Sequence, residues 1–209
     1  MTGRRTSSAT LRVPPARLYV VAQVHGADVV EITAADTPEA VARRPGDALI
    51  ARADGLACGV RVADCVPVLL ADRASGAVAA VHAGWRGVVA DVVGAAVAAL
   101  RAGAPGEPDL VAAIGPHISA AAFEVGEDVA TALGAVAPGV PAVRQSPGGR
   151  PCVDLRALVR AELVRAGVPM AAIDDVAGCT FSEPDRFFSF RRDGAHSGRH
   201  LAAIVARAG

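Results

Sequence analysis

The sequence predicts a single-domain protein of the mixed α/β class. Short apolar runs typical of buried strands alternate along the chain with segments whose apolar residues recur at helical spacing. The chain has 209 residues, a length that suits one domain with a sizeable core. It shows no internal repeat and no sign of a second domain. We therefore expect residues 1–17 to form an N-terminal tail and residues 18–209 to form one domain.

The N-terminal part of the domain is predicted to contain one strand and a long loop. Residues 18–22 form an uninterrupted apolar run with the length of a buried strand. The peptide Gln-Val-His-Gly follows directly and places His25 just after this strand. Residues 37–46 contain proline, glycine and charged residues, and they predict a loop with at most one short helical turn.

A hairpin of two buried strands is predicted next. The apolar segments 66–71 and 77–81 are separated by polar residues and a glycine at 72–76, which are typical of a turn. If the two strands pair in antiparallel fashion about that turn, Cys65 and His82 lie at the same end of the hairpin. These two residues, which are far apart in the sequence, would then be close in space.

Two helices and two further strands are predicted after the hairpin. Apolar residues recur at helical spacing over residues 88–100. Asp154 is suited to cap a second helix, which Gly167 stops. Both segments are amphipathic and are expected to cover a sheet. The apolar runs at 109–114 and 201–205 predict a buried strand and the final strand.

His25, Cys65 and His82 are the candidate metal ligands. Cysteine and histidine side chains either bind a metal such as zinc or form a thiolate nucleophile with its base. Two histidines and one cysteine leave the fourth tetrahedral position of zinc open to water or substrate, which is the arrangement of a catalytic site. The alternatives are a metal-free Cys65–His82 nucleophile, and an inert core cysteine beside ordinary histidines.

Six short peptides carry a resemblance to a known family. They cover most of the chain from about residue 18 to the end, and they are Gln23–Gly26, Ala63–Cys65, His82–Gly87, Ile114–Pro116, Phe123–Gly126 and Phe187–Gly194. With these peptides in this order, the sequence resembles the bacterial laccase-domain family. Members of that family are variously described as polyphenol oxidase laccases, peptidoglycan-editing factors and purine nucleoside phosphorylases.

The resemblance implies a fold, a metal site and an activity. The implied fold is an α/β/β/α sandwich of two mixed sheets with helices outside. The resemblance further implies that His25, Cys65 and His82 hold a zinc ion. It implies an enzyme that phosphorolyses adenosine, inosine and methylthioadenosine and can deaminate adenosine. The sequence departs from the family pattern in two places, and both concern the expected substrate pocket. Only 22 residues precede Gln23, fewer than is common in the family, and residues 119–123 replace a Gly-Pro-Cys-Cys-Tyr run of the family.

Four further residues are candidates for chemistry or substrate binding. Asp64 precedes Cys65 and is a candidate proton acceptor or ligand-orienting carboxylate, with a turn-capping aspartate as the alternative. Arg86 follows a tight bend at an expected helix start and is a candidate anion ligand, or else an exposed terminal charge. Phe188 and Arg192 belong to a segment that offers aromatic surface to a purine and cations to phosphate. A core phenylalanine and a surface ion pair are the alternatives for these two.

The composition excludes several classes of function. All 21 basic residues are arginines and balance 21 acidic residues, so a broad nucleic-acid-binding face is not expected. The absence of lysine excludes a Schiff base and a P-loop lysine. No apolar run reaches the ~18 residues of a membrane span. The four cysteines are scattered without a CxxC pair, which favours reduced thiols and a cytoplasmic protein.

We therefore predict a zinc-dependent purine nucleoside enzyme whose partners are purine nucleosides and phosphate. Asp64, Cys65 and His82 are its predicted catalytic residues. The alternatives are a Cys–His hydrolase and a peptidoglycan-editing factor without nucleoside turnover. A copper polyphenol oxidase is least favoured, because its copper centres need many more histidines than the five present. The sequence does not define an oligomeric state.

Overall fold

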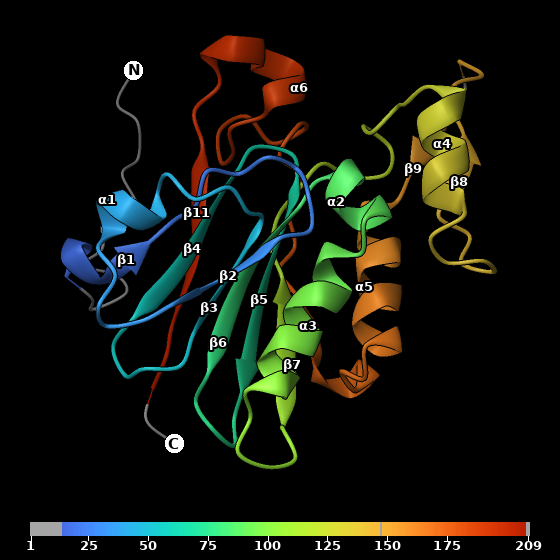
Figure 1. The fold of residues 1–209 in the computed structure, drawn as a ribbon. Helices are drawn as coiled ribbons and strands as arrows, with labels where there is room; N and C mark the ends of the chain where they lie inside the picture. Colours follow the sequence, from blue (N-terminus) through green and yellow to red (C-terminus); the bar gives the residue numbers. More distant parts are fainter. Residues whose placement is uncertain (1–13, 147, 208–209) are drawn as a thin grey trace.

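Two mixed β-sheets stacked face to face form the centre of the fold, and helices cover the outer face of the larger sheet (Figure 1). The structure is a computed structural model and describes residues 14–146 and 148–207. The larger sheet has six strands in the order β10-β7-β5-β6-β3-β2, and the smaller has three in the order β1-β4-β11. Both sheets contain parallel and antiparallel pairs. The predicted α/β class and mixed-sheet sandwich are confirmed.

The strands and helices have the following bounds. The larger sheet consists of β2 (Val29–Ile32), β3 (Ala48–Ala51), β5 (Val66–Asp72), β6 (Val78–Ala83), β7 (Leu110–Ile114) and β10 (Ile173–Asp175). The smaller sheet consists of β1 (Leu18–Tyr19), β4 (Ala57–Val62) and β11 (His200–Val205), and a separate hairpin pairs β8 (Val143–Gln145) with β9 (Pro151–Val153). The α-helices are α1 (Pro38–Val41), α2 (Trp85–Val89), α3 (Val92–Ala102), α4 (Glu127–Gly134), α5 (Leu155–Arg165) and α6 (Phe190–Asp193). Among the described residues, no helix is long and apolar enough to cross a membrane.

The central strands of the larger sheet are buried on both faces. In β6, Ala79 and Val81 join the core beneath the helices, while Val78 and Ala80 join the core between the two sheets. Successive side chains of a strand point to opposite faces, so both sets are apolar. This is why the strands occur in the sequence as continuous apolar runs. By the same alternation, His82 lies on the face of β6 turned toward the smaller sheet.

The predicted hairpin is confirmed, and it determines where the candidate site lies. β5 and β6 pair in antiparallel fashion, with Pro67 opposite His82. Cys65 directly precedes β5, so it lies at the same end of the hairpin as His82. The turn contains Gly76 at a φ of 74°, a left-handed conformation that glycine adopts without strain.

The segment predicted as one helix over residues 88–100 is divided between two helices, α2 and α3. The break falls at Asp91, whose φ of 60° is left-handed and therefore not that of a continuing helix. The buried face of α3 consists of Val92, Val93, Ala96, Val97 and Leu100. Val88 of α2 joins the same core, which is why the apolar periodicity continues through the break.

The first strand is shorter than the predicted segment 18–22. Only its first two residues, β1, pair with β4. Ala22 instead exchanges backbone hydrogen bonds with Arg44 and Gly46, at 2.9 and 3.2 Å. The chain thus leaves the smaller sheet to meet the loop of residues 37–46, in which the predicted helical turn is present as α1.

The other predicted elements are confirmed. α5 begins at the predicted cap, because Asp154 Oδ1 accepts a hydrogen bond from the backbone N–H of Ala157 at 3.0 Å. β7 and β11 occupy the segments 109–114 and 201–205 to within one residue. These elements pack as expected: α3 and α5 lie side by side on one face of the larger sheet, and β11 lies on its other side in the smaller sheet (Figure 1).

The predicted N-terminal tail, residues 1–17, is described only in part. Residues 1–13 lie outside the described residues. Pro15–Arg17 forms a short 3-10 turn, and Arg17 Nη1 donates to the Asp54 carbonyl at 3.1 Å. The boundary between the tail and the domain stays a prediction.

Candidate metal centre and its pocket

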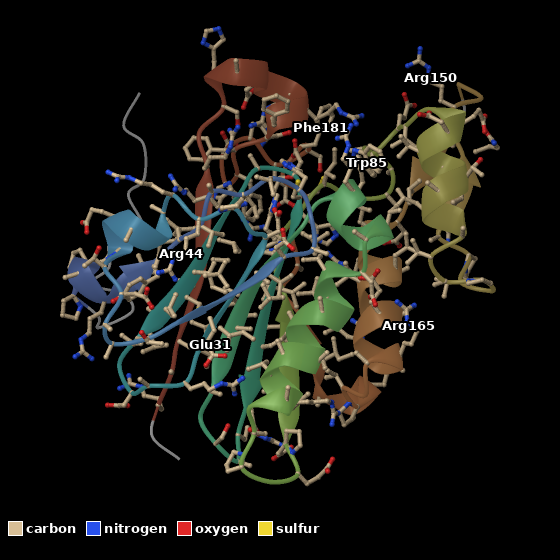
Figure 2. All side chains as sticks on the ribbon, in the orientation of Figure 1. Glu31, Arg44, Trp85, Arg150, Arg165 and Phe181 are labelled. Atoms are coloured by element: carbon tan, nitrogen blue, oxygen red, sulfur yellow. The ribbon has the colours of Figure 1, made fainter. Side chains whose placement is uncertain are left out.

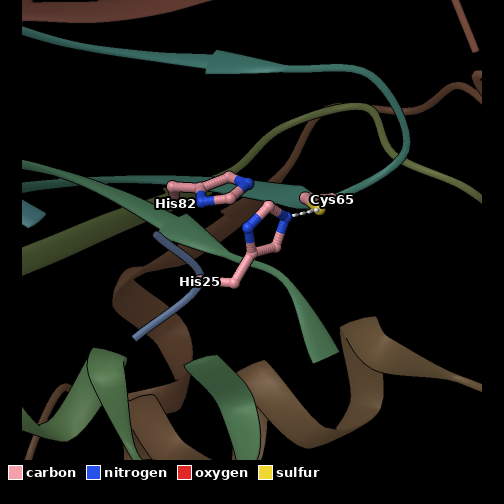
Figure 3. A group of neighbouring side chains, drawn as sticks. All are labelled: His25, Cys65 and His82. Carbon is pink, nitrogen blue, oxygen red and sulfur yellow. Dashed lines mark hydrogen bonds between the residues drawn. The ribbon is translucent and has the colours of Figure 1, made fainter. Parts of the chain in front are cut away.

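Three residues from separate segments meet at one end of the sheets (Figure 3). His25 comes from the loop after β1, Cys65 from the turn before β5, and His82 from the end of β6. One nitrogen of each histidine and the cysteine sulfur all lie within 4.8 Å of one another. His25 Nε2 is 3.9 Å from Cys65 Sγ, and the two imidazole rings meet edge to face with centroids 4.7 Å apart. The structure thus brings together the three candidate ligands identified from the sequence.

Asp47 organises this site, and sequence reasoning did not identify it. Its side chain is fully buried just before β3. Oδ1 accepts from His82 Nδ1 at 2.7 Å and from the His25 backbone N–H at 2.9 Å. Oδ2 accepts from the backbone N–H groups of Val24 and Gly26, at 3.2 and 2.6 Å. One carboxylate therefore fixes the ring of one candidate ligand and the loop that carries another.

A signal for Asp47 was present in the sequence. It is a carboxylate directly before a wholly apolar strand, as Asp109 is before β7, and a buried carboxylate needs hydrogen-bond partners. The sequence offers Asp64, which adjoins Cys65, as a proton acceptor or as the ligand-orienting carboxylate. Within the described residues, Asp47 is the carboxylate that orients a candidate ligand.

Burial and hydrogen bonding together set the charges of this group. Burial opposes ionisation of Asp47, but the hydrogen bonds from His82, Gly26 and His25 outweigh it and hold the Asp47 pKa below its usual value. Burial also opposes the charged form of His82, yet its contacts with Asp47 and Cys65 raise its pKa to about 9. Burial opposes the Cys65 thiolate as well, while the contacts with both histidines lower its pKa to about 7. The thiolate is the form of cysteine that binds metals and attacks substrates.

Gly84 is small enough to let the three side chains come together. A Cβ atom at this position would lie 2.8 Å from His25 Cδ2 and 3.1 Å from Cys65 Sγ. Gly87 is similarly constrained, because a Cβ atom there would lie 3.1 Å from the Gly26 carbonyl oxygen. A larger residue at either glycine of the His82–Gly87 peptide would therefore clash with the residues that form the site.

The donor set fits a tetrahedral zinc ion. Because His82 Nδ1 is bonded to Asp47, its Nε2 is left for a metal, and a carboxylate behind a ligating imidazole is usual in zinc proteins. Nitrogen and sulfur ligands of tetrahedral zinc lie roughly 3.5 Å apart. The candidate ligand atoms, all within 4.8 Å of one another, need only small movements to reach that spacing. A set of two imidazoles and one thiolate would leave one position open to water or substrate.

The three candidate ligands line a cavity of about 510 Å³, a volume suited to a small organic ligand. Apolar and cationic side chains form much of its remaining wall, and they include Ile118, Phe123, Phe190, Arg61, Arg191 and Arg199. Arg191 belongs to the segment that the sequence predicts to offer cations to phosphate, and the other five were not predicted as site residues. The sequence signal was strongest for Arg191, which lies in one of the family peptides beside the predicted Arg192.

Asp64 lines the same cavity beside Cys65 and is held by two short hydrogen bonds. Its Oδ1 accepts from Thr180 Oγ1 and its Oδ2 from the backbone N–H of Arg191, both at 2.6 Å. Its φ of 91° is positive, a conformation that residues other than glycine seldom adopt, although aspartate tolerates it better than most. Such strain is concentrated at functional sites in proteins. The position and the strain of Asp64 are compatible with its predicted catalytic role.

Two predicted substrate contacts, Arg86 and Phe188, are not among the residues that line the cavity. Arg86 is exposed on α2, where its guanidinium lies 4.3 Å from the ring centroid of Trp85, which is labelled beside α2 in Figure 2. Phe188 packs against His200 with ring centroids 5.1 Å apart, and its backbone N–H donates to His200 Nε2 at 2.7 Å. Phe188 is half-buried and belongs to neither hydrophobic core, so its role stays a prediction, while the exposure of Arg86 matches the terminal-charge alternative.

Arg192, the third predicted substrate contact, is engaged with the protein itself. Its guanidinium has five N–H donors. Each has an acceptor at 2.9 Å, and these acceptors are the carbonyls of Thr180, Phe181 and Phe187 and both carboxylate oxygens of Asp193. Arg192 thus holds the C-terminal segment together and has no donor left for phosphate. This geometry argues against Arg192 as an anion ligand.

The sequence matches the family model described as multi-copper polyphenol oxidoreductase laccase over residues 1–207. A purine nucleoside phosphorylase of Bacteroides thetaiotaomicron is 42% identical over an alignment of 163 positions that covers 76% of this chain but only 60% of that protein. A protein named adenosine deaminase RL5, from an unknown prokaryotic organism, is 39% identical over an alignment of 212 positions that covers 98% of this chain and 80% of that protein. The crystal structure of YlmD from Geobacillus stearothermophilus matches with a TM-score of 0.84 at 32% identity, covering 96% of this chain and 77% of that one.

Proposed function

This chain belongs to the multi-copper polyphenol oxidoreductase laccase family, and we propose that it is a zinc-dependent enzyme of purine nucleosides. The proposed reactions are phosphorolysis of adenosine, inosine and methylthioadenosine, and deamination of adenosine. The names of two relatives, a purine nucleoside phosphorylase and an adenosine deaminase, support both reactions. The observation that carries the proposal is the meeting of His25, Cys65 and His82 within 4.8 Å at a cavity of about 510 Å³.

His25, Cys65 and His82 would hold the zinc ion, and Asp47 would keep the His82 ring oriented. Zinc bound there supplies Lewis-acid chemistry, which lowers the pKa of water toward ~7. The hydrogen bond from His82 Nδ1 to Asp47 at 2.7 Å keeps the opposite ring nitrogen available as a ligand. Copper is a less favoured occupant of the same three residues.

Adenosine deamination requires a group that moves a proton. Water adds to C6 of the adenine ring and the C6–N6 bond breaks, so that inosine and ammonia form. A proton passes from the attacking water to the leaving nitrogen. Asp64 is the cavity carboxylate that can take and return this proton as a general acid–base catalyst. Its hydrogen bonds from Thr180 and the Arg191 backbone hold it in place.

Phosphorolysis places different demands on the same cavity. An oxygen of phosphate forms a bond to C1′ of the ribose while the bond from C1′ to the purine nitrogen breaks. The purine leaves with the proton that hydrogen phosphate gives up, and ribose 1-phosphate forms. The phosphate requires cationic side chains and the purine requires apolar surface. The cavity provides both, with Phe123, Phe190 and Ile118 as its apolar part.

Metal analysis combined with activity assays tests this function. We expect about one zinc per chain. Adenosine, inosine and methylthioadenosine should yield free base only when phosphate is present, whereas adenosine should release ammonia without phosphate. A chelator should abolish both reactions and added zinc should restore them. If the zinc-loaded protein turns over none of these nucleosides, the enzyme proposal is wrong, and the peptidoglycan-editing alternative is tested by the peptidoglycan composition of a deletion strain.

A metal-free Cys–His hydrolase is the second candidate, favoured by the contacts that run from Asp47 through His82 to Cys65. An imidazole that is oriented by a carboxylate and lies beside a thiol is the arrangement of a covalent catalyst. Such an enzyme would be inactivated by iodoacetamide and unaffected by chelators. Loss of activity on chelation, with recovery on adding zinc, would exclude it.

A multicopper oxidase is disfavoured by the histidines, despite the family description. The chain has only five histidines, fewer than its several copper centres would need. His117 and His200 each use a ring nitrogen elsewhere, with the Gly115 carbonyl at 2.8 Å and the Phe188 N–H at 2.7 Å. Among the described residues, His25, Cys65 and His82 form the single cluster that could hold a metal ion.

We also propose a cytoplasmic location. The four cysteines, which are Cys58, Cys65, Cys152 and Cys179, are all free thiols in the structure. Free thiols persist in reducing compartments, whereas disulfides form in oxidising ones. Fractionation of cells with an antibody against the protein would test this location.

A further inference from the structure

Three arginines line the metal pocket, and within the described part of the chain none of them forms an ion pair. They are Arg61 in β4, Arg191 in α6 and Arg199 directly before β11. Many other arginines of the chain do form ion pairs, for example Arg73 with Asp109 at 2.9 Å. The three arginines of the pocket therefore carry charges that no carboxylate of a described residue neutralises directly.

The pocket is consequently electropositive. Its lining includes one carboxylate, Asp64, and both oxygens of that group already accept hydrogen bonds. Guanidinium groups stay ionised at every pH that a folded protein experiences. All three arginines are exposed to solvent, so an anion from solution can reach them. A cavity of this kind concentrates anions.

Arg191 has hydrogen-bond donors left for a ligand. Its Nη1 donates to the Glu124 carbonyl at 2.9 Å, and its guanidinium lies 5.4 Å from the ring centroid of Phe123. Among the described residues its side chain makes no other hydrogen bond, so most of its donors remain available. Its backbone N–H binds Asp64, which places this arginine beside the carboxylate of the pocket. The neighbouring Arg192, in contrast, uses all its donors internally.

Arg61 lies in β4, and Arg199 directly precedes β11, the strand that pairs with β4 in the smaller sheet. Arg61 lies opposite Leu201 in the antiparallel pair of β4 and β11, and Arg199 is two residues before Leu201, so both arginines lie on the same face. Gln23 holds the Arg61 backbone through two hydrogen bonds at 2.8 Å, while the Arg61 guanidinium has no hydrogen-bond partner among the described residues. Arg199 Nη1 donates to two nearby carbonyls at 2.9 Å, and its guanidinium lies 5.4 Å from the ring centroid of Phe190. Its other nitrogens have no hydrogen-bond partner among the described residues.

We propose that Arg61, Arg191 and Arg199 form an oxyanion subsite of the metal pocket that binds a phosphate dianion. This inference deepens the proposed function and rests on it. Guanidinium groups pair with phosphate oxygens through two parallel hydrogen bonds, and the chain has no lysine to replace them. The subsite takes the place of Arg86 and Arg192, the anion ligands predicted from the sequence. Its chemistry suits both inorganic phosphate and the phosphate group of a nucleotide.

Single substitutions test the subsite, and the chain offers a matched control. The test variants are Arg61→Gln, Arg191→Gln and Arg199→Gln. The control is Arg186→Gln, because Arg186 is exposed too but stacks on Phe187 outside the cavity. Isothermal titration of the zinc-loaded protein with inorganic phosphate should show affinity roughly tenfold to a hundredfold weaker in each test variant, and unchanged in the control. Melting temperatures serve as the check on folding.

Kinetics give a second readout of the same variants. The apparent KM for phosphate in phosphorolysis should rise in step with the loss of affinity, and each test variant should lose more phosphorolysis than phosphate-independent deamination of adenosine. The control Arg186→Gln lies outside the cavity and should keep both activities. Arg191→Lys, which keeps the charge but not the planar fork, should fall between the wild type and Arg191→Gln.

The outcomes separate the subsite from the proposed function. Unchanged phosphate affinity in all three variants overturns the subsite, even if nucleosides are phosphorolysed normally. Loss of phosphate binding in the variants of a protein that turns over no nucleoside keeps the subsite and contradicts the function. Titration with adenosine 5′-monophosphate identifies the source of the anion. If adenosine 5′-monophosphate binds more tightly than inorganic phosphate and the same variants lose this binding, the subsite is assigned to nucleotides. If only inorganic phosphate binds, the subsite is assigned to phosphorolysis.

Discussion

Asp47 Oδ1 lies 2.7 Å from His82 Nδ1, and this hydrogen bond joins a residue before β3 to a residue near the end of β6. The same oxygen accepts the backbone N–H of His25 at 2.9 Å. A single buried carboxylate therefore positions two of the three candidate metal ligands. A substitution at Asp47 is therefore expected to disturb the positions of both His25 and His82.

Asp47→Asn should weaken zinc binding roughly tenfold to a hundredfold, the usual effect of losing the partner of a ligating histidine. The amide nitrogen of asparagine would face a backbone N–H donor, and the negative charge that supports His82 would be gone. Competition with a zinc chelator measures the affinity. Asp109→Asn, at a surface carboxylate paired with Arg73, is the control. Equal zinc affinity in both variants would mean that Asp47 serves the fold alone.

Cys65→Ala should remove most of the zinc from a protein that otherwise holds about one ion per chain. The thiolate supplies one of the three ligands, and two imidazoles alone bind zinc much more weakly. Elemental analysis of the purified protein gives the stoichiometry. Cys152→Ala, at a buried cysteine away from the cavity lining, should keep its zinc. Stoichiometric zinc in the Cys65 variant would rule out the three-ligand site.

Gly84→Ala should reduce zinc affinity more than it reduces the stability of the fold. The added methyl group would lie 2.8 Å from His25 Cδ2, and the exposed His25 side chain can turn away while its backbone stays bonded to Asp47. The displaced imidazole would then no longer reach the metal. Zinc titration and thermal unfolding of the metal-free protein separate the two effects. A loss of folding without a change in affinity would contradict this account of Gly84.

Asp64→Asn tests whether this carboxylate moves protons. A general acid or base contributes roughly two to four orders of magnitude to turnover, so adenosine deamination should fall by that factor. Zinc content and melting temperature should stay near those of the wild type. Asp64 also accepts hydrogen bonds from Thr180 and the Arg191 backbone. If folding or zinc is lost together with activity, Asp64 has a structural role.

Glu162 should make the stability of the protein fall as the pH rises from ~4.3 to about 8. Its side chain is fully buried in α5, and neither carboxylate oxygen has a hydrogen-bond partner among the described residues. Burial raises the pKa of Glu162 to about 8; Asp91 adds to this effect and Arg165 opposes it. Below ~4.3 the carboxyl is protonated in both states, and above that pH only the unfolded chain releases its proton.

Glu162→Gln isolates this effect, because glutamine does not ionise. The free energy of unfolding of the wild type, relative to the variant, should fall with pH by up to ~1.4 kcal/mol per unit in this range. Urea unfolding at a series of pH values between 4 and 9 measures it. The slope is the diagnostic quantity, since the buried amide of the variant has a cost of its own at every pH. Parallel curves for the two proteins would show that Glu162 ionises normally in the folded state.

Much of the fold could be predicted from the sequence, because local patterns encode local structure. The apolar runs of β5 and β6, separated by a polar turn, predicted the hairpin that places Cys65 and His82 at one end. The periodic apolar face before Gly167 and its cap at Asp154 predicted α5. The residue types His, Cys and His, each next to an apolar run, predicted the candidate metal site. Apolar periodicity and capping residues reflect burial and backbone geometry, and both can be recognised within a single stretch of the sequence.

The rest was decided by contacts between residues far apart in the sequence. Asp47 became part of the site because the register of β3 against β6 brings it to His82. Arg61 and Arg199 share a face because β4 pairs with β11, while Arg192 is removed from the substrate pocket by carbonyls that only the folded C-terminal segment assembles. Local patterns show that a residue is charged or buried. The partner that satisfies it depends on strand register and loop packing, and these are set only when the whole chain has folded.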